Sequence, residues 1–90
     1  MKRSVVSSIS IKWERRAVTE LASLPRSDQQ RVFDAVGALR KNPLKGKALS
    51  GRWKGFRRLR IGRYRIIYAF DGTELLISIL RVAHRREAYR

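Results

Sequence analysis

Cysteine is absent from this 90-residue chain, which contains one histidine, His84, and seven scattered carboxylates. Without cysteine there is no disulfide framework, no thiolate metal site and no cysteine nucleophile. One histidine cannot build a histidine metal cluster by itself, and the carboxylates fall in none of the spacings typical of metal enzymes. We therefore expect neither a metal ion nor a cofactor.

Long apolar runs are also lacking. No apolar stretch approaches the roughly 18 residues that cross a bilayer, and the initial MKRSVVSS does not contain the apolar region of a signal peptide. No internal repeat, low-complexity tract or Pro/Gly-rich linker divides the chain, so we predict a single domain over residues 1–90. We expect this domain in the cytoplasm and no association with a membrane.

Positive charge, in contrast, is abundant. The chain has 22 Lys and Arg against 7 Asp and Glu, a formal net charge of +15. Residues 44–90 hold 13 basic and 3 acidic side chains, whereas residues 1–43 hold 9 and 4. Such an excess indicates a polyanionic partner. Charge for solubility alone is the weaker explanation, because self-repulsion costs stability that neutral polar residues would not.

The C-terminal half is the predicted contact surface, and arginine predominates there. Arginine suits phosphate because its planar fork donates two parallel hydrogen bonds and stacks on bases.

Hydrophobic periodicity predicts a strand followed by a helical hairpin. Residues 8–11 alternate as an opening strand, and apolar residues recur at helical spacing over residues 13–24. Ser27 and Gln30 match a capping box at the start of a second helix, which residues 42–43 (Asn-Pro) end. Both helices have an apolar stripe, so the hairpin needs a sheet against which to bury it.

The remainder of the chain predicts that sheet. Residues 44–54 mix glycines and basic residues and predict a loop. Three segments then have strand patterns and are joined by tight turns at residues 62–63 and 71–72: residues 56–61, 64–70 and 74–83. They form an antiparallel meander in an α+β fold. The last strand is apolar on both faces, which indicates a position near the middle of the sheet.

Strand alternation predicts where the arginines of the meander point. If the apolar positions of these strands pack on the helical hairpin, Arg58, Arg60 and Arg65 emerge together on the open face. Arg81 and Arg85 join them only if the last strand takes the matching register. Guanidinium groups crowded in this way repel each other unless an anion lies between them.

A phosphorane formed during RNA cleavage is such an anion, and RNA supplies its own nucleophile, the 2′-hydroxyl. The enzyme then aligns that hydroxyl, stabilises the phosphorane and manages two proton transfers. Arginine is a poor base because its pKa exceeds about 12. Tyr89, Glu87 and His84 are the candidates for proton transfer, and each can equally be a surface or packing residue. Trp53 and Phe56 either stack bases or pack at the rim of the fold.

The order of these elements, together with three sequence motifs, resembles the RelE/ParE toxin superfamily. The motifs are GRWKG at residues 51–55, RRLRIGRYRIIY at residues 57–68 and RVAHRREAYR at residues 81–90. The resemblance covers almost the whole chain and implies the RelE-like microbial RNase fold. It implies a toxin of a type II toxin-antitoxin system that enters the ribosomal A site and cuts mRNA without a metal, leaving a 2′,3′-cyclic phosphate.

Two alternatives remain open within and beside this superfamily: a ParE-like inhibitor of DNA gyrase without nuclease chemistry, and an inactive nucleic-acid-binding relative. The resemblance also implies a partner, an acidic and partly disordered antitoxin that folds around the toxin.

The resemblance implies roles for individual residues. The arginines implied to stabilise the phosphorane are Arg58, Arg60, Arg65 and Arg85, and Tyr89 is the implied base or orienting group. Arginine stands where the best-known member has lysine on the first meander strand, which argues against a general base there. The shortened tail leaves Arg85 and Arg86 as alternatives. The basic residues predicted to contact RNA are Lys45, Lys47, Arg52, Lys54, Arg57, Arg81, Arg86 and Arg90.

Overall fold

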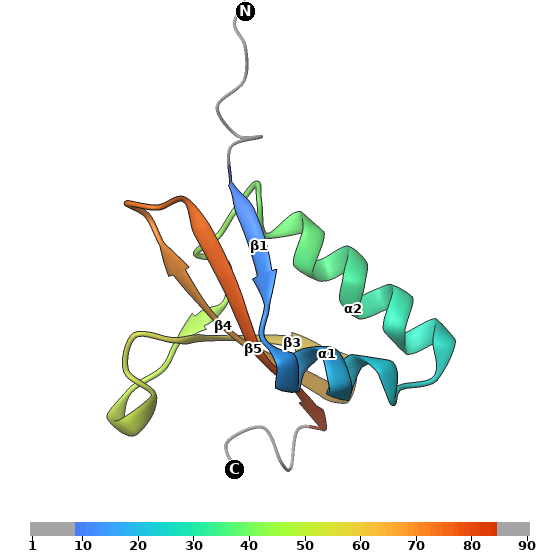
Figure 1. The fold of residues 1–90 in the computed structure, drawn as a ribbon. Helices are drawn as coiled ribbons and strands as arrows, with labels where there is room; N and C mark the ends of the chain where they lie inside the picture. The colour runs from blue at the N-terminus through green and yellow to red at the C-terminus, as the bar shows by residue number, and fades with distance from the viewer. Residues whose placement is uncertain (1–8, 85–90) are drawn as a thin grey trace, which may run out of the picture.

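A computed structural model of the chain describes residues 9–84 and contains two α-helices and a five-stranded sheet (Figure 1). The elements are β1 (Ser10–Trp13), α1 (Arg15–Ala22), α2 (Arg26–Ala38), β2 (Lys47–Ala48), the 3-10 helix η2 (Gly51–Trp53), β3 (Arg57–Ile61), β4 (Tyr64–Asp71) and β5 (Leu76–His84). The predicted α+β fold, with its opening strand, helical hairpin and meander, is confirmed.

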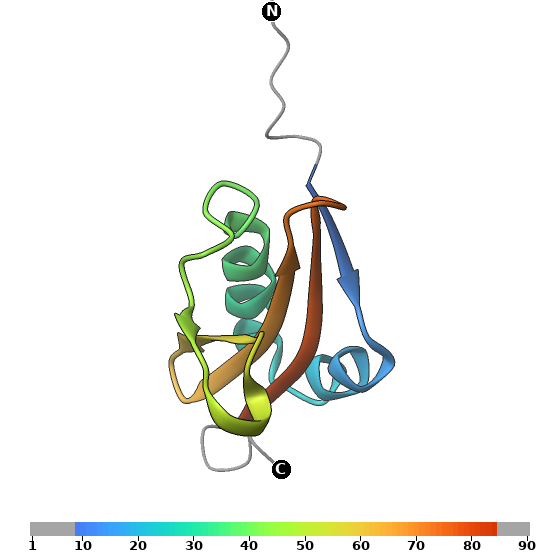
Figure 2. The ribbon, with the colours of Figure 1, turned by 90° about the vertical axis from the view of Figure 1, so that its left-hand side faces the viewer.

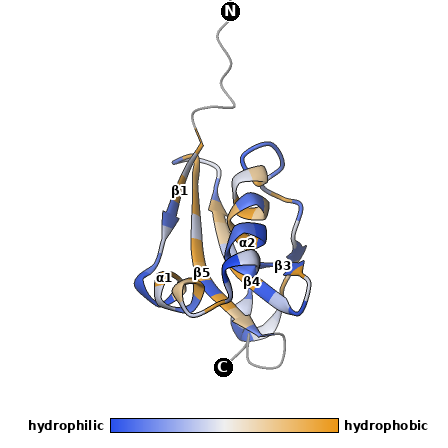
Figure 3. Ribbon diagram, turned by 90° about the vertical axis from the view of Figure 1, so that its right-hand side faces the viewer, coloured by the Kyte–Doolittle hydropathy of each residue, from blue (hydrophilic) through white to orange (hydrophobic). Residues whose placement is uncertain are grey.

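The strands lie in the order β1-β5-β4-β3-β2. The meander pairs β3, β4 and β5 antiparallel, and β1 pairs parallel with the first residues of β5, from Ser10 opposite Leu76 to Trp13 opposite Ile79. Parallel neighbours need a long connection between them, and here that connection includes both helices and the rest of the meander. The predicted central position of β5 is therefore confirmed, and Figure 3 shows most of it in the hydrophobic colour.

Both helices cover one face of the sheet (Figures 1 and 3). The core between the helices and this face is one cluster of buried side chains: Ala17, Val32, Val36, Leu39, Leu59, Ile66, Tyr68, Ile77, Ile79 and Val82. The members on β3 and β4 occupy alternate positions, as the period of two along a strand requires. This is the face that the sequence assigned to the helical hairpin.

The opposite face of the sheet, which we call the open face, has a smaller apolar cluster. Ile67 and Ala83 are buried there, and partly buried hydrophobic residues pack against them: Leu49, Trp53, Phe56 and Leu80. Three of these four come from residues 49–56, which we call the aromatic loop. It lies on the side of the sheet away from α2 (Figures 1 and 2).

Trp13 was assigned to the first helix by its spacing, and this assignment is wrong. Trp13 is the last residue of β1, and α1 begins at Arg15. The indole ring stacks on Phe33 of α2, with ring centroids 6.2 Å apart and an interplanar angle of 11°. A large ring at the strand-helix junction fits both the strand period and the helix period. The contact with Phe33, 20 residues away in the chain, is made with Trp13 in the strand.

The predicted capping box at Ser27 is also wrong. Pro25 is the N-cap of α2, the helix begins at Arg26, and no side chain caps it. Gln29 instead donates hydrogen bonds from Nε2 to the carbonyls of Ala22 and Leu24, at 3.2 and 3.0 Å. The polar residues of this first turn therefore satisfy the end of α1, whose last carbonyls have no partner within the helix.

The two predicted turns of the meander differ in outcome. The turn at residues 62–63 is confirmed, and Gly62 adopts a φ of 58° there. The turn after β4 is longer than the two residues predicted, because β5 begins only at Leu76. Asp71 Oδ1 accepts hydrogen bonds from the amides of Thr73 and Glu74, at 2.9 and 3.1 Å, which closes a local turn beyond residue 72.

Within residues 9–84, neither α-helix has the length and apolar character needed to cross a lipid bilayer.

Candidate nucleic-acid interface

A long stretch of the chain contains no acidic residue. Residues 35–70 hold eleven Lys or Arg and no Asp or Glu. This stretch forms the end of α2 and all of β2, η2 and β3, together with β4 up to its last residue, Asp71. The described carboxylates lie before it, in the segment from β1 to α2, or after it, at the turn between β4 and β5. β3 therefore supplies no carboxylate to the open face, and β4 supplies none before its last residue, Asp71.

The register of β3 against β4 brings three arginines together. Arg60 pairs directly with Arg65, and Arg58 pairs with Ile67, which is buried on the open face. Leu59 lies between the two β3 arginines and is buried on the helical face. The predicted grouping of Arg58, Arg60 and Arg65 on the open face is confirmed, and we call these three residues the arginine cluster.

Like charges at paired positions on adjacent strands are destabilising. Arg60 is exposed, while Arg58 and Arg65 are half-buried. Partial burial strengthens electrostatic interactions, because less water screens them. The arginine cluster is thus arranged to attract an anion strongly. It lies beside Ile67, the buried apolar residue of β4 that pairs with Arg58.

The aromatic loop borders this cluster. Trp53 and Phe56 contact each other edge to face, with centroids 5.8 Å apart, and both pack against the apolar cluster of Ile67 and Ala83. Of the two roles left open for them, packing is the one that the structure shows. Base stacking stays a prediction, since both rings are only partly buried.

The loop that precedes β2 is held by Tyr68 and places a lysine next to the cluster. The Tyr68 hydroxyl accepts a hydrogen bond from the Gly46 amide at 2.8 Å and donates one to the Pro43 carbonyl at 2.7 Å. Lys47 follows directly and pairs with Arg58. Burial raises the pKa of Tyr68 above its ordinary value of 10.0, outweighing the Gly46 bond and the charge of Arg57, so its hydroxyl stays protonated at neutral pH.

Gly46 cannot be replaced without strain at this point. A Cβ at Gly46 would lie 2.8 Å from the backbone oxygen of Arg58 and 2.7 Å from the Tyr68 ring. The close approach of the loop to β3 therefore requires glycine. Lys45 and Lys47, on either side of Gly46, are exposed.

The remaining basic residues of the predicted interface divide into two groups. Lys45, Lys47, Arg52 and Lys54 are exposed on the segments around the arginine cluster. Arg57, although predicted to contact RNA, pairs with Tyr68 and donates from Nη1 to the carbonyls of Gly46 at 2.7 Å and Leu44 at 3.2 Å. Because its guanidinium is bound to these backbone oxygens, Arg57 is removed from the interface.

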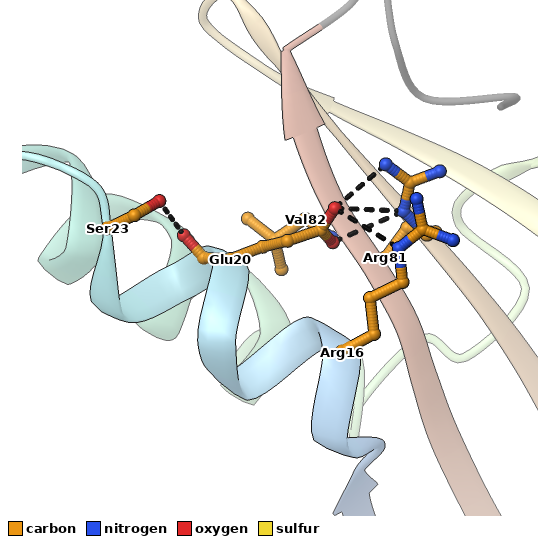
Figure 4. A network of polar contacts seen from close by, with 5 residues as sticks. All are labelled: Arg16, Glu20, Ser23, Arg81 and Val82. Atoms are coloured by element: carbon orange, nitrogen blue, oxygen red, sulfur yellow. Dashed lines mark hydrogen bonds and ion pairs between the residues drawn. The ribbon is translucent and has the colours of Figure 1, made fainter.

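Arg81 is also removed from the interface. Its side chain is only 6% exposed and forms an ion pair with Glu20 of α1, with 2.8 Å between Nη2 and Oε2 (Figure 4). The register does pair Arg81 with Ile67, as an open-face position requires. The bulge of β5 near this point and the nearby carboxylate of α1 direct its guanidinium to the helix.

His84, one candidate for proton transfer, is the last residue of β5. It pairs with Tyr64 and contacts that ring edge to face at 6.2 Å. The Tyr64 hydroxyl donates to Asp28 Oδ2 at 3.2 Å. Desolvation and then the Asp28 carboxylate raise the pKa of Tyr64, which keeps its hydroxyl protonated at neutral pH. Both rings therefore lie on the helical side of the sheet, and a role of His84 in proton transfer stays a prediction.

The tail residues of the predicted site lie outside the described residues: Arg85, Arg86, Glu87, Tyr89 and Arg90. The last described residues lie beside the arginine cluster, because Ala83 pairs with Arg65. Within residues 9–84, no three His, Asp or Glu side chains gather where they could hold a metal ion.

Sequence patterns missed the residues that organise the interface. They did not indicate that Tyr68 holds the loop at Gly46 or that Glu20 binds the backbone of β5 at Val82. Their partners lie 22 and 62 residues away in the chain. No local pattern contains that information.

Comparison with known proteins gives a consistent result. The family described as the ParE toxin of the type II toxin-antitoxin system, parDE, matches residues 11–89. Toxin RelG of Mycobacterium tuberculosis (strain ATCC 25618 / H37Rv) is 34% identical over 83 residues, which cover 90% of this chain and 95% of the relative. Toxin RelE of the same organism is 33% identical over 76 residues, which cover 82% of this chain and 78% of the relative.

Solved structures agree with these relatives. The toxin-antitoxin complex RelBE2 from Mycobacterium tuberculosis contains a chain with a TM-score of 0.79 and 32% identity, covering 87% of this chain and 99% of that one. The archaeal RelE-RelB complex from Pyrococcus horikoshii OT3 gives a TM-score of 0.76 at 27% identity, covering 90% of this chain and 99% of that one.

Proposed function

The chain belongs to the ParE toxin family of type II toxin-antitoxin systems, and on that premise we propose that it is a ribosome-dependent endonuclease that cuts mRNA. It is a RelE-like toxin, and its curated relatives carry RelG and RelE names. The observation that carries the proposal is the arginine cluster, in which Arg58, Arg60 and Arg65 share one face of the sheet within a stretch, residues 35–70, that holds no Asp or Glu.

In the proposed reaction, the 2′-hydroxyl oxygen of one nucleotide attacks the adjacent phosphorus. The bond from phosphorus to the 5′-oxygen of the next nucleotide breaks, leaving a 2′,3′-cyclic phosphate and a 5′-hydroxyl. The attacking hydroxyl gives up its proton to a base, and the leaving oxygen takes one from an acid. No metal or cofactor enters this scheme.

The arginine cluster stabilises the phosphorane, on which negative charge accumulates in the transition state. Three preformed guanidinium groups bind that charge more strongly than the single charge of the substrate. Arg85 adds a further guanidinium in this proposal, with Arg86 as its alternative, and Tyr89 is the group that accepts the proton or orients the nucleophile. Exposed lysines and arginines around the cluster hold the flanking phosphates: Lys45, Lys47, Arg52, Lys54, with Arg90 in the tail.

The proposal is tested in an in vitro translation reaction in which mRNA 5′-ends are mapped after the protein is added. We expect cuts at defined codon positions. Arg65→Ala lowers the cleavage rate by roughly 100-fold or more, as expected when one donor to the transition state is lost, and Tyr89→Phe also suppresses cleavage. Arg15→Ala removes the same charge from an exposed position of α1 and leaves cleavage within about twofold.

Equal cleavage by Arg65→Ala and Arg15→Ala would contradict the proposal. So would intact mRNA in the presence of well-folded wild-type protein.

One rival function has an observation in its favour, because the matching family is described by its ParE member. A ParE-like protein would inhibit DNA gyrase by binding protein and would have no nuclease chemistry. Intact mRNA together with loss of gyrase supercoiling in a purified assay would support this rival. The arginine cluster favours the nuclease, since binding to gyrase does not require three arginines grouped on one face of the sheet.

We also propose a cognate acidic antitoxin as the partner. The similar RelBE2 and RelE-RelB structures are toxin-antitoxin complexes, and a net charge of +15 favours an acidic partner. The proposed substrate, mRNA on the ribosome, requires the toxin to act in the cytoplasm.

A further inference from the structure

β5 pairs with β1 only over its first residues, and this pairing ends before β5 reaches the arginine cluster. β1 ends at Trp13, which pairs with Ile79, and the Glu14 amide donates to the Ile79 carbonyl at 2.9 Å. β5 continues to His84. From residue 80 onward this edge of β5 has no strand beside it, in the part of the chain that the structure describes. An uncovered edge leaves backbone amides that need another partner.

The register of β5 also changes at this point. Tyr68 pairs with Ile79, but Ile67 pairs with Arg81, so Leu80 is an extra residue opposite β4. Such a bulge bends the strand and redirects the residues that follow it. The segment beyond the bulge is the one that runs beside the arginine cluster, because Ala83 pairs with Arg65.

Glu20 of α1 binds the strand directly after the bulge (Figure 4). Its Oε1 accepts a hydrogen bond from the Val82 amide at 2.8 Å. Its Oε2 accepts hydrogen bonds from Arg81, at 3.0 Å from Nε and 2.8 Å from Nη2, and lies 3.6 Å from Arg16 Nε. The carboxylate thus occupies the place that a neighbouring strand would otherwise take.

We propose that Glu20 is a positioning residue, which sets the course of β5 past the arginine cluster. The inference rests on the proposed nuclease function for its consequence, but its structural step is independent of that function. Glu20 acts through Val82, which pairs with Ile66, one residue from Arg65.

A carboxylate is required at this position because all of its partners are donors. An amide of the same size offers one acceptor oxygen, and its NH₂ group would face N–H groups of Arg81 or Val82. One of those donors would then lose its hydrogen bond. Arg81 and Glu20 are 6% and 21% exposed, so water replaces the lost bond poorly.

The test compares Glu20→Gln with Glu14→Gln. Both substitutions remove one negative charge, but the Glu14 side chain forms an exposed ion pair with Lys12, at 3.8 Å, and its bonds to Ile79 and Val18 come from the backbone, which the substitution keeps. We expect Glu20→Gln to lower kcat for cleavage of ribosome-bound mRNA by roughly ten- to hundredfold with little change in KM, because misplacement by about 1 Å can cost that much. Glu14→Gln keeps the wild-type kcat and KM.

A third variant, Glu20→Asp, keeps the charge but shortens the side chain by one methylene. It is expected to lose kcat to a smaller degree while its melting temperature stays near that of the wild type, which keeps the proposal testable if Glu20→Gln folds poorly. Equal kcat in Glu20→Asp, Glu14→Gln and the wild type would overturn the proposal.

Amide hydrogen exchange separates this proposal from the proposed function. Exchange at Val82 should accelerate in Glu20→Gln and Glu20→Asp and stay unchanged in Glu14→Gln, whether or not the protein cuts RNA. If the wild type does not cleave mRNA, the nuclease proposal is wrong while the Val82 result still tests the anchoring of β5. If Val82 exchanges at the same rate in all variants, the positioning proposal is wrong even where cleavage is observed.

Discussion

The two faces of the sheet use arginine in opposite ways. On the helical face, Arg57 binds backbone carbonyls, while beyond the end of β1 Arg81 binds the Glu20 carboxylate of α1. On the open face, Arg58, Arg60 and Arg65 lie together within residues 35–70, which hold no Asp or Glu. Arg57 and Arg58 are adjacent in the chain, so residue type alone does not determine whether an arginine binds within the fold or faces the open side of the sheet. The neighbours that the fold supplies on each face determine it.

The apolar support of the two faces differs as well, and two neighbouring residues of β4 test this difference. Ile66 and Ile67 are both 0% exposed, but Ile66 lies in the large core under the helices and Ile67 in the small cluster under the aromatic loop. We expect Ile66→Ala to cost about 4 kcal/mol and Ile67→Ala about 2 kcal/mol, because a small cluster under a loop collapses around the cavity more readily. Urea denaturation measures both free energies of unfolding.

If both isoleucine variants lose the same free energy of unfolding, the apolar cluster of the open face is packed as tightly as the core under the helices.

The next largest effect concerns the two adjacent arginines. Arg58→Ala should lower mRNA cleavage by roughly 100-fold and leave stability unchanged or slightly higher, since like charges repel across the strands. Arg57→Ala should lower the free energy of unfolding by about 1–2 kcal/mol through its two lost hydrogen bonds, with a much smaller loss of cleavage. Cleavage rates and thermal melts of both proteins provide the check. If one of the two variants lost more of both cleavage and stability than the other, the two arginines would not have the separate roles proposed for them.

The loop that carries Lys45 and Lys47 to the open face depends on Gly46. Gly46→Ala should destabilise the protein by about 1–3 kcal/mol, because the added methyl group meets the Arg58 carbonyl and the Tyr68 ring. Gly37→Ala is the matched control, since a Cβ at Gly37 in α2 meets nothing within 4 Å. That change should stabilise the helix by up to about 1 kcal/mol. Chemical denaturation of the pair would show effects of opposite sign, and a neutral Gly46→Ala would contradict the close approach.

The smallest predicted effect is the pH dependence of stability. The pKa of Tyr68 is raised in the folded protein above 10.0, so its contribution is fully present below pH 10 and is lost as the pH rises through the folded value. Tyr68→Phe should lose about 1 kcal/mol at pH 7 through its hydrogen bonds and show a shallower alkaline decline than the wild type. Unfolding free energies measured from pH 7 to 11 test this; parallel alkaline curves for the two proteins would refute it.

Much of the fold follows from local patterns, and the exceptions have identifiable causes. Alternation in β3 and β4 correctly assigned Leu59 and Ile66 to the helices and the arginine cluster to the opposite side, because the period of a strand is insensitive to distant contacts. Trp13 was misassigned because a ring at a junction fits two periods until Phe33 stacks on it. The turn after Asp71 was predicted too short because its carboxylate satisfies two amides further along.

The site shows the same division. The arginine cluster was predictable because both strands of its hairpin are continuous in the chain and joined by a turn at Gly62. The sequence did not predict that Arg57 and Arg81 bind groups within the fold, because each acceptor comes near its arginine only after folding. Acceptors for Arg57 lie 11 and 13 residues away, and the acceptor for Arg81 lies 61 residues away.

Side-chain period and charge were sufficient to predict an α+β fold with a basic face, since both are properties of residues close together in the chain. Three features arose only from tertiary contacts: the parallel pairing of β1 with β5, the hold of Tyr68 on the loop at Gly46, and the binding of Glu20 to the edge of β5. Each joins segments far apart in sequence, and a hydrogen bond depends on position and direction in space that no one-dimensional pattern records.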